Sequence, residues 1–147
     1  MGLFDAIGIA GSGLTADRIR MDVTAENLAN AQTTKAANGK PYQRQEVQLA
    51  QVGARNFGGA LSNALAQSGP KPGGVQVTGI VADNSPDQQV YDPGNPEANA
   101  KGYVLMPNVS TVTEMTDMIS ESQSYQSDVT AMQTAKSMFT STLGLLK

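Results

Sequence analysis

Three acidic residues, Glu114, Asp117 and Glu121, are the side chains best suited to chemistry in this sequence. Their spacing of three and four places them on one helical face, where carboxylates can exchange protons or hold a metal ion. The sequence has no His and no Cys, which excludes the common catalytic triads and thiolate metal sites. A solvated first helical turn that complements the helix dipole explains these acids more simply. We therefore expect no catalytic residue, no cofactor and no metal.

Two further motifs also have a simpler explanation than catalysis. The stretch IGIAGSGLTA at 7–16 has the glycine spacing of a dinucleotide fingerprint, but no second strand follows it. Apolar residues instead continue at helical spacing across its glycines, which predicts a helix. The glycines would make this helix loosely formed, with a thin surface that allows close packing. The run Ser68-Gly69-Pro70-Lys71 matches the S-x-x-K motif of serine acyl-enzymes. It lies in a linker-like stretch, and we interpret it as a chance match.

Length and charge limit the class of protein. The 147 residues have room for one domain, and charged residues make up only 16% of them. The net charge is -3 and the basic residues do not cluster, so nucleic acid is not an expected partner. No stretch reaches the roughly 18 apolar residues of a membrane-spanning helix, and the N-terminus lacks the pattern of a cleaved secretion signal.

Apolar residues at seven-residue intervals predict a long helix at each end of the chain. We expect their rows to pack against one another within a subunit or between subunits. The packing residues are Ile7, Leu14, Met21 and Leu28 in the N-terminal row, and Met115, Met118, Tyr125, Val129, Met132, Phe139, Leu143 and Leu146 in two C-terminal rows. Lys136 interrupts a core position, where it either fixes register or extends its ammonium group to solvent.

The start of the second helix has two competing signals. Thr111 with Glu114 offers a capping box, and Asn108 offers an alternative cap. We expect the helix to begin between Asn108 and Thr111.

The middle of the chain is different in kind. Short alternating apolar runs and the turn-rich stretch DPGNPEANAKG predict a small β hairpin or sheet, and residues 53–74 have the composition of a linker. The fold class is therefore α+β. Discontinuous N- and C-terminal long helices, within 1–31 and 108–147, form a coiled-coil-like inner domain, and 32–107 supply a small β-rich insertion with loops.

Three stretches resemble a known family. RIRMDVTAENLANAQTT at 18–34 resembles the N-terminal signature of flagellar rod and hook axial proteins, and 102–143 resembles their C-terminal helix. The stretch VYDPGNPEANAKGYVLMPNV at 90–109 resembles the proximal rod members in particular. The chain departs from the signature at Gln32, where asparagine is usual, and 55–74 looks like a variable insertion. The signature residues are Asn27, Leu28, Ala29, Asn30 and Thr33.

The resemblance implies a structural subunit of the bacterial flagellar basal-body rod and no enzyme. Such a subunit is exported through the type III apparatus without a cleavable signal peptide and assembles helically in the periplasmic space. Its partners would be copies of itself, other flagellar rod proteins, basal-body base and export-gate proteins, and the surrounding rings. Its terminal helices would enclose the export channel, and the rod would transmit torque for motility. Asn27, Asn30, Gln32 and Thr33 would lie just past the first helix, as a cap or as bridges to neighbours.

Other functions remain as alternatives. Another rod or hook member of the same family is the nearest one. A cytoplasmic helical adaptor would use the Met-rich stripe to bind one partner, because Met side chains adapt to several surfaces. An enzyme would use a pair of carboxylates, which the lack of His disfavours.

Overall fold

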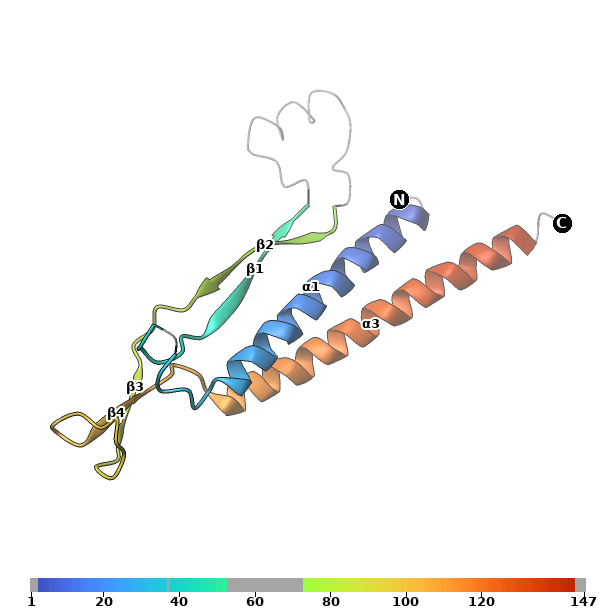
Figure 1. Ribbon diagram of the computed structural model, residues 1–147. Helices are drawn as coiled ribbons and strands as arrows, with labels where there is room; N and C mark the ends of the chain where they lie inside the picture. The colour runs from blue at the N-terminus through green and yellow to red at the C-terminus, as the bar shows by residue number, and fades with distance from the viewer. Residues whose placement is uncertain (1–2, 37, 53–72, 145–147) are drawn as a thin grey trace, which may run out of the picture. The chain divides into compact units, whose positions relative to one another are not determined.

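The computed structural model describes residues 3–36, 38–52 and 73–144. A long helix lies at each end of the chain and short strands lie between them (Figure 1), which confirms the α+β class. The elements are α1 (Leu3–Ala29), β1 (Gln45–Gln51), β2 (Val75–Ala82), β3 (Gln88–Tyr91), β4 (Tyr103–Met106) and α3 (Thr111–Gly144).

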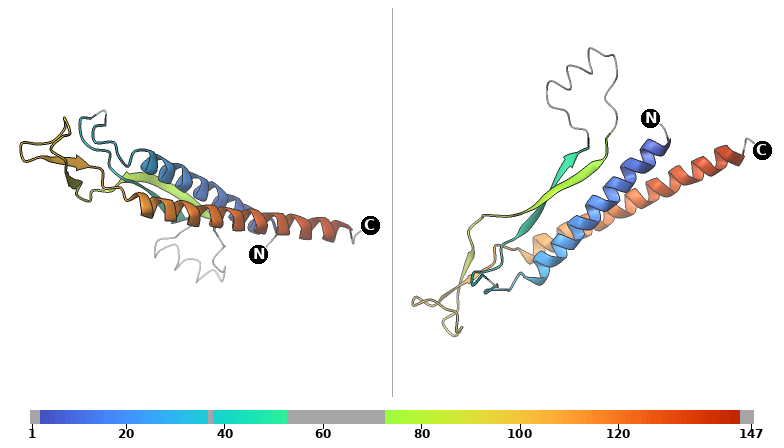
Figure 2. Two further views of the ribbon diagram at one scale, coloured as in Figure 1. Left: turned by 90° about the horizontal axis from the view of Figure 1, so that it is seen from below. Right: turned by 45° about the horizontal axis from the view of Figure 1, so that its top comes forward.

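The chain forms two compact units, and the division runs across both helices. Unit 1 consists of Met1–Arg18, Gln48–Gly79 and Gln123–Lys147. Unit 2 consists of Ile19–Val47 and Ile80–Ser122. Both helices are nevertheless continuous ribbons in every view (Figure 2), and each contributes one segment to each unit.

In unit 1, glycines allow α1 to approach α3 closely. A Cβ atom at Gly11 would lie 3.7 Å from Met132 Cε, and one at Gly13 would overlap the carboxylate of Asp128. Residues 7–16 are helical throughout, so the predicted helix is confirmed and a strand-to-helix nucleotide-binding turn is absent from this stretch. The Ser68–Lys71 motif lies outside the described residues.

Ser110 sets the start of α3. Its hydroxyl accepts a hydrogen bond from the Thr113 backbone N–H at 3.4 Å, and its carbonyl accepts one from the Glu114 N–H at 2.9 Å. The helix thus begins at Thr111, inside the predicted interval, but neither predicted cap is used. Asn108 instead accepts a hydrogen bond from the Arg44 N–H, at 2.8 Å. No Pro follows until the chain ends, and the only Gly is Gly144, so nothing breaks the helix.

The described strands form two two-stranded sheets. β3 and β4 are antiparallel, with Val90 opposite Val104 and Tyr91 opposite Tyr103. In β1 and β2, the Val52 N–H donates to the Gly74 carbonyl and the Asp83 N–H donates to the Arg44 carbonyl. The segment between the two helices in the sequence therefore forms short antiparallel strand pairs, as the alternating apolar runs predicted.

The apolar core is small and lies mainly in unit 2. Its buried aliphatic residues are Val23, Ala31, Val104 and Val109, whereas unit 1 contributes Ala16. Polar and charged side chains are buried beside them, including Asn27 and Glu114, each only 1% exposed. Because a buried polar group is costly unless it is hydrogen-bonded, these side chains mark the structure's most specific contacts.

Candidate functional site

Arg44 is the centre of a buried polar cluster in unit 2. Its Nε atom lies 2.5 Å from Oε1 of Glu114, and its Nη2 atom lies 3.5 Å from Oδ2 of Asp117. Glu46 pairs with it from the start of β1. The hydrogen bond to Glu114 is the main cause that raises the pKa of Arg44. The guanidinium therefore provides a permanent positive charge for an almost fully buried carboxylate.

The side-chain amide of Asn27 joins three parts of unit 2. Its Nδ2 atom donates to the Gln45 carbonyl at 2.9 Å and to Glu114 Oε2 at 3.0 Å. Its Oδ1 atom accepts from the Tyr42 hydroxyl and from the Gln45 N–H, both at 2.9 Å. Asn27 was predicted to lie just past the first helix, but it lies inside α1. Its helical position lets the amide face α3 and the start of β1 together.

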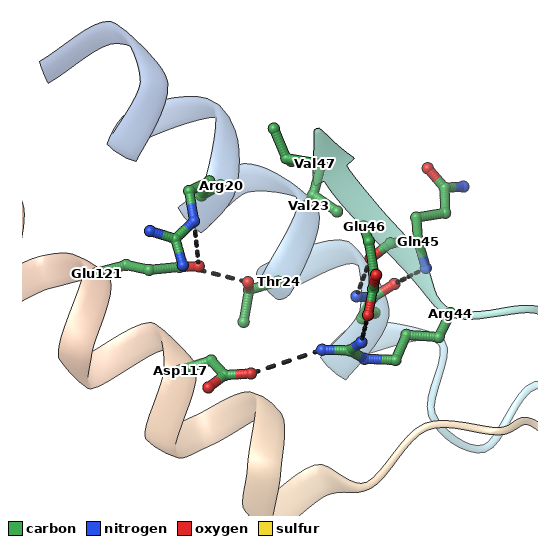
Figure 3. A pocket seen from close by; sticks show the side chains of 10 residues that line it. Arg20, Val23, Thr24, Arg44, Gln45, Glu46, Val47, Asp117 and Glu121 are labelled. Atoms are coloured by element: carbon green, nitrogen blue, oxygen red, sulfur yellow. Dashed lines mark hydrogen bonds and ion pairs between the residues drawn. The ribbon is translucent and has the colours of Figure 1, made fainter. Parts of the chain in front are cut away.

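Glu121 extends the cluster along α3, one heptad beyond Glu114. Its carboxylate accepts a hydrogen bond from the Thr24 hydroxyl at 3.1 Å and pairs with Arg20 Nε at 3.3 Å (Figure 3). Arg20, Thr24 and Asn27 are spaced by four and three along α1, so they share one face. Two polar helical faces thus meet inside unit 2.

The expectation of a solvated acidic turn is wrong for Glu114 and Glu121. Both are buried, and only Asp117 among the three acids is half-buried. The predicted shared face exists, but Arg20 and Arg44 from distant parts of the chain cover it. The spacing of residues along the sequence does not predict that these two arginines pair with the acids of α3. Among the residues that the structure describes, no group of three or more acidic side chains could hold a metal ion.

A polar cleft of about 180 Å³ opens beside this cluster. Figure 3 shows that charged and amide side chains line it from α1, β1 and α3. Its lining residues are Arg20, Val23, Thr24, Asn27, Arg44, Gln45, Glu46, Val47, Asp117 and Glu121. The carboxylates of Glu114 and Glu121 already accept hydrogen bonds, so the arrangement serves to hold α1, β1 and α3 together.

Tyr42 completes the cluster as a hydrogen-bond donor. Burial is the main cause that raises its pKa to about 12, and the negative charges of Glu26 and Glu114 add to the effect. The phenol therefore stays protonated at neutral pH and donates to Asn27.

Two other signature residues close the end of α1. The side-chain amide of Asn30 donates to the Glu26 carbonyl at 3.0 Å, and the Thr33 hydroxyl donates to Asn30 Oδ1 at 3.2 Å. These contacts satisfy polar groups at the helix end, as a C-terminal cap does. Gln32 is exposed.

The predicted packing residues differ in burial. Ile7, Leu14, Met21 and Leu28 are half-buried, as are Met118, Val129, Met132 and Phe139. Met115, Tyr125 and Leu143 are exposed, and so is Lys136. Leu146 lies outside the described residues. The most buried positions of α1 are instead Ala16, Asp17, Val23, Thr24 and Asn27.

In the first turns of α3, apolar side chains are exposed and charged side chains are buried, which we call the reversed polarity of α3. Val112, Met115 and Ile119 are 74%, 53% and 61% exposed, whereas Glu114 and Glu121 are buried. At 3.6 residues per turn, the aliphatic residues and the acids lie on opposite sides of the helix. This distribution is the reverse of the usual one, in which apolar side chains are buried and charged side chains are exposed.

Family comparisons agree with this arrangement of terminal helices. The family described as "Flagella basal body rod protein" matches residues 7–36. The family described as "Flagellar basal body rod FlgEFG protein C-terminal" matches residues 100–145. The two matches cover most of α1 and α3, and they define the chain as a member of the flagellar rod class.

Whole-chain relatives narrow this class further. The chain is 42% identical to the flagellar basal-body rod protein FlgC of Bacillus subtilis over 151 residues, which cover all of both chains. It is 43% identical to FlgC of Escherichia coli O157:H7, covering 99% of this chain and 98% of the relative. It is 41% identical to FlgC of Borreliella burgdorferi, covering 100% and 99%. The chain belongs to the FlgC family of flagellar basal-body rod proteins.

Proposed function

We propose that this chain is a structural subunit of the bacterial flagellar basal-body rod, which assembles helically into the proximal part of the drive shaft. Its relatives at 41% to 43% identity carry the name of a basal-body rod protein. In this role the subunit transmits torque, helps to enclose the export channel and is needed for motility.

The reversed polarity of α3 is the observation that supports this function most. Val112, Met115 and Ile119 expose aliphatic surface at one end of the helix. Full burial of such a side chain stabilises an assembly by about 1.5 to 3 kcal/mol. The acids on the opposite side are already held by Arg20 and Arg44 within the chain, so a neighbouring subunit would contact the apolar side of this part of α3.

The proposed neighbours are copies of the chain and other flagellar rod proteins. Base and export-gate proteins and the surrounding rings are further partners of a proximal rod subunit. The helical segments within 1–31 and 108–147 form the inner part of the assembly, and 32–107 form the outer part. The predicted heptad rows would pack in that inner part.

The proposed location is the periplasmic rod, reached without a cleavable signal peptide. Across the described residues, neither helix is long and apolar enough to cross a membrane. We also propose that the chain is no enzyme. Its buried carboxylates bind arginine, hydroxyl and amide donors, which leaves them poorly placed for acid or base catalysis.

Deletion of the gene in its own host tests the proposal. Cells that lack the chain should build no complete rod and should not swim, and the wild-type gene supplied in trans should restore both. Electron microscopy of purified basal bodies gives the readout. Complete rods in the deletion strain would contradict the proposed function.

A further inference from the structure

Asn38 and Gly39 form the only Asn-Gly pair in the sequence. Both residues are exposed, and Gly39 has a φ of +75°. The Ala36 N–H closes the turn around them by donating to the Lys40 carbonyl at 2.8 Å. An asparagine amide can react with the backbone nitrogen of the residue that follows it. Glycine hinders this approach least, because it has no Cβ atom and adopts many backbone conformations. The pair is therefore a candidate site of chemical modification.

The turn polarises the side-chain amide of Asn38. The backbone N–H of Lys40 donates to Asn38 Oδ1 at 3.0 Å. This oxygen gains negative charge when a nucleophile attacks Cγ, so the hydrogen bond stabilises the transition state in the manner of an oxyanion hole. The ring of atoms that the hydrogen bond closes contains both Asn38 Cγ and the Gly39 nitrogen. The bond therefore keeps the two reacting atoms near each other.

The Gly39 N–H itself donates to the Ala36 carbonyl at 2.8 Å. This second hydrogen bond has to open before the nitrogen can lose its proton and attack. Exposed turns open locally at little cost in free energy. The fold therefore slows the reaction at this turn without preventing it.

Two other asparagines have the same polarised amide but a different neighbour. In each, Oδ1 accepts a hydrogen bond from the N–H two residues later, at 3.0 Å for Asn95 and at 2.9 Å for Asn99. Pro96 follows Asn95, and its nitrogen has no proton to lose. Ala100 follows Asn99, and its Cβ atom hinders the approach. Of these three sites, only Asn38 is followed by an unhindered nitrogen.

We propose that Asn38 is a site of spontaneous deamidation. The Gly39 nitrogen loses its proton and attacks Asn38 Cγ, and the new C–N bond closes a succinimide ring. The Cγ–Nδ2 bond breaks and releases ammonia. Water then adds to either carbonyl of the succinimide. One product has aspartate at position 38, and the other has isoaspartate, in which the backbone runs through Cγ. Either product adds a negative charge to the turn.

Ageing of the purified full-length chain at mildly alkaline pH tests the assignment. Trypsin releases the peptide 36–44 intact, because Pro41 follows Lys40 and prevents cleavage there. Mass spectrometry with fragmentation then assigns each modified asparagine and distinguishes aspartate from isoaspartate. Asn38 should deamidate at least about tenfold faster than Asn95 and Asn99, which corresponds to about 1.4 kcal/mol in activation free energy. A smaller ratio would overturn the inference.

The variant Asn38→Gln provides a matched control. It keeps a side-chain amide at this position, but its longer side chain would have to close a larger ring, which is slower. Ion-exchange chromatography should show an acidic form that accumulates in the wild-type chain and not in the variant. Equal accumulation in both chains would place the modification elsewhere and overturn the inference.

Discussion

Arg44 and Glu114 lie 70 positions apart in the sequence, and their Nε and Oε1 atoms are 2.5 Å apart in the fold. This contact joins the residue that precedes β1 to the first turn of α3. The Glu114 side chain is only 1% exposed, so water contributes little to its stabilisation. The pair therefore fixes which residues of the two elements face each other, a role well suited to buried polar contacts.

Replacement of Arg44 by Met should strongly destabilise the chain. The change leaves the Glu114 carboxylate buried without its cation, and such a loss typically costs about 3 to 5 kcal/mol. Urea unfolding of the purified chain measures the effect. Glu46→Gln is the matched control, because Glu46 is exposed and its loss should cost less than about 1 kcal/mol. Equal effects of both variants would contradict the central role of the Arg44–Glu114 pair.

Asn27→Asp should also be destabilising although it changes few atoms. The new carboxylate loses both donated hydrogen bonds and lies beside Glu114 Oε2, which now accepts from Asn27 at 3.0 Å. We expect a cost of about 2 to 4 kcal/mol at neutral pH, because charged buried groups without partners are costly. Asn30→Asp is the control, since it loses one exposed contact to the Glu26 carbonyl. Thermal unfolding that ranks Asn30→Asp as the worse variant would refute the assignment.

Tyr42 should make stability fall at alkaline pH. Its folded pKa of about 12 lies above the ordinary value of 10.0, so folding favours the neutral phenol. This contribution is fully present below pH 10.0 and is lost as the pH rises through about 12. Tyrosinate absorbance should contain a step near pH 12 that Tyr42→Phe removes. A wild-type titration without that step would count against the buried hydrogen bond to Asn27.

Because α1 approaches α3 closely in unit 1, the effect of replacing Gly13 on stability should depend on the side chain at Asp128. Gly8→Ala should stabilise the helix by up to about 1 kcal/mol, because a Cβ there meets no atom within 4 Å. Gly13→Ala should gain less, because its Cβ overlaps the Asp128 carboxylate. In an Asp128→Ala background the Gly13→Ala gain should reach that of Gly8→Ala. Chemical unfolding of the wild-type chain, Gly13→Ala, Asp128→Ala and the double variant forms a double-mutant cycle, and strict additivity would argue against the contact.

The helices were predictable because their signal is local. Apolar residues at seven-residue intervals reveal a helix without reference to the rest of the chain, and the absence of Pro between Val109 and Leu143 allows it to continue. The start at Thr111 lies in the interval expected from the two local capping signals at Asn108 and Thr111. The cap at Ser110 was missed, because Thr111 with Glu114 forms a stronger local pattern that tertiary contacts override.

The polar cluster could be predicted only in part. The spacing of Glu114 and Glu121 correctly placed them on one face, but their burial depends on Arg20 and Arg44, which no spacing rule connects to them. Asn27 belongs to a recognisable signature, yet its amide makes contacts with Gln45 and Glu114 that exist only after the chain has folded. Local sequence patterns therefore lack the information about which residues, far apart in the sequence, pair with one another in the fold.

The most direct test of the assembly account is the single substitution Ile119→Glu. Ile119 is 61% exposed on the apolar side of α3, so the unfolding free energy of the purified chain should change by less than about 0.5 kcal/mol. Basal bodies from cells with this variant should nevertheless lack complete rods, because a charge would enter the subunit contact. An intact purified chain with absent rods is the predicted result. Complete rods and normal swimming would contradict the claim that neighbouring subunits cover this face.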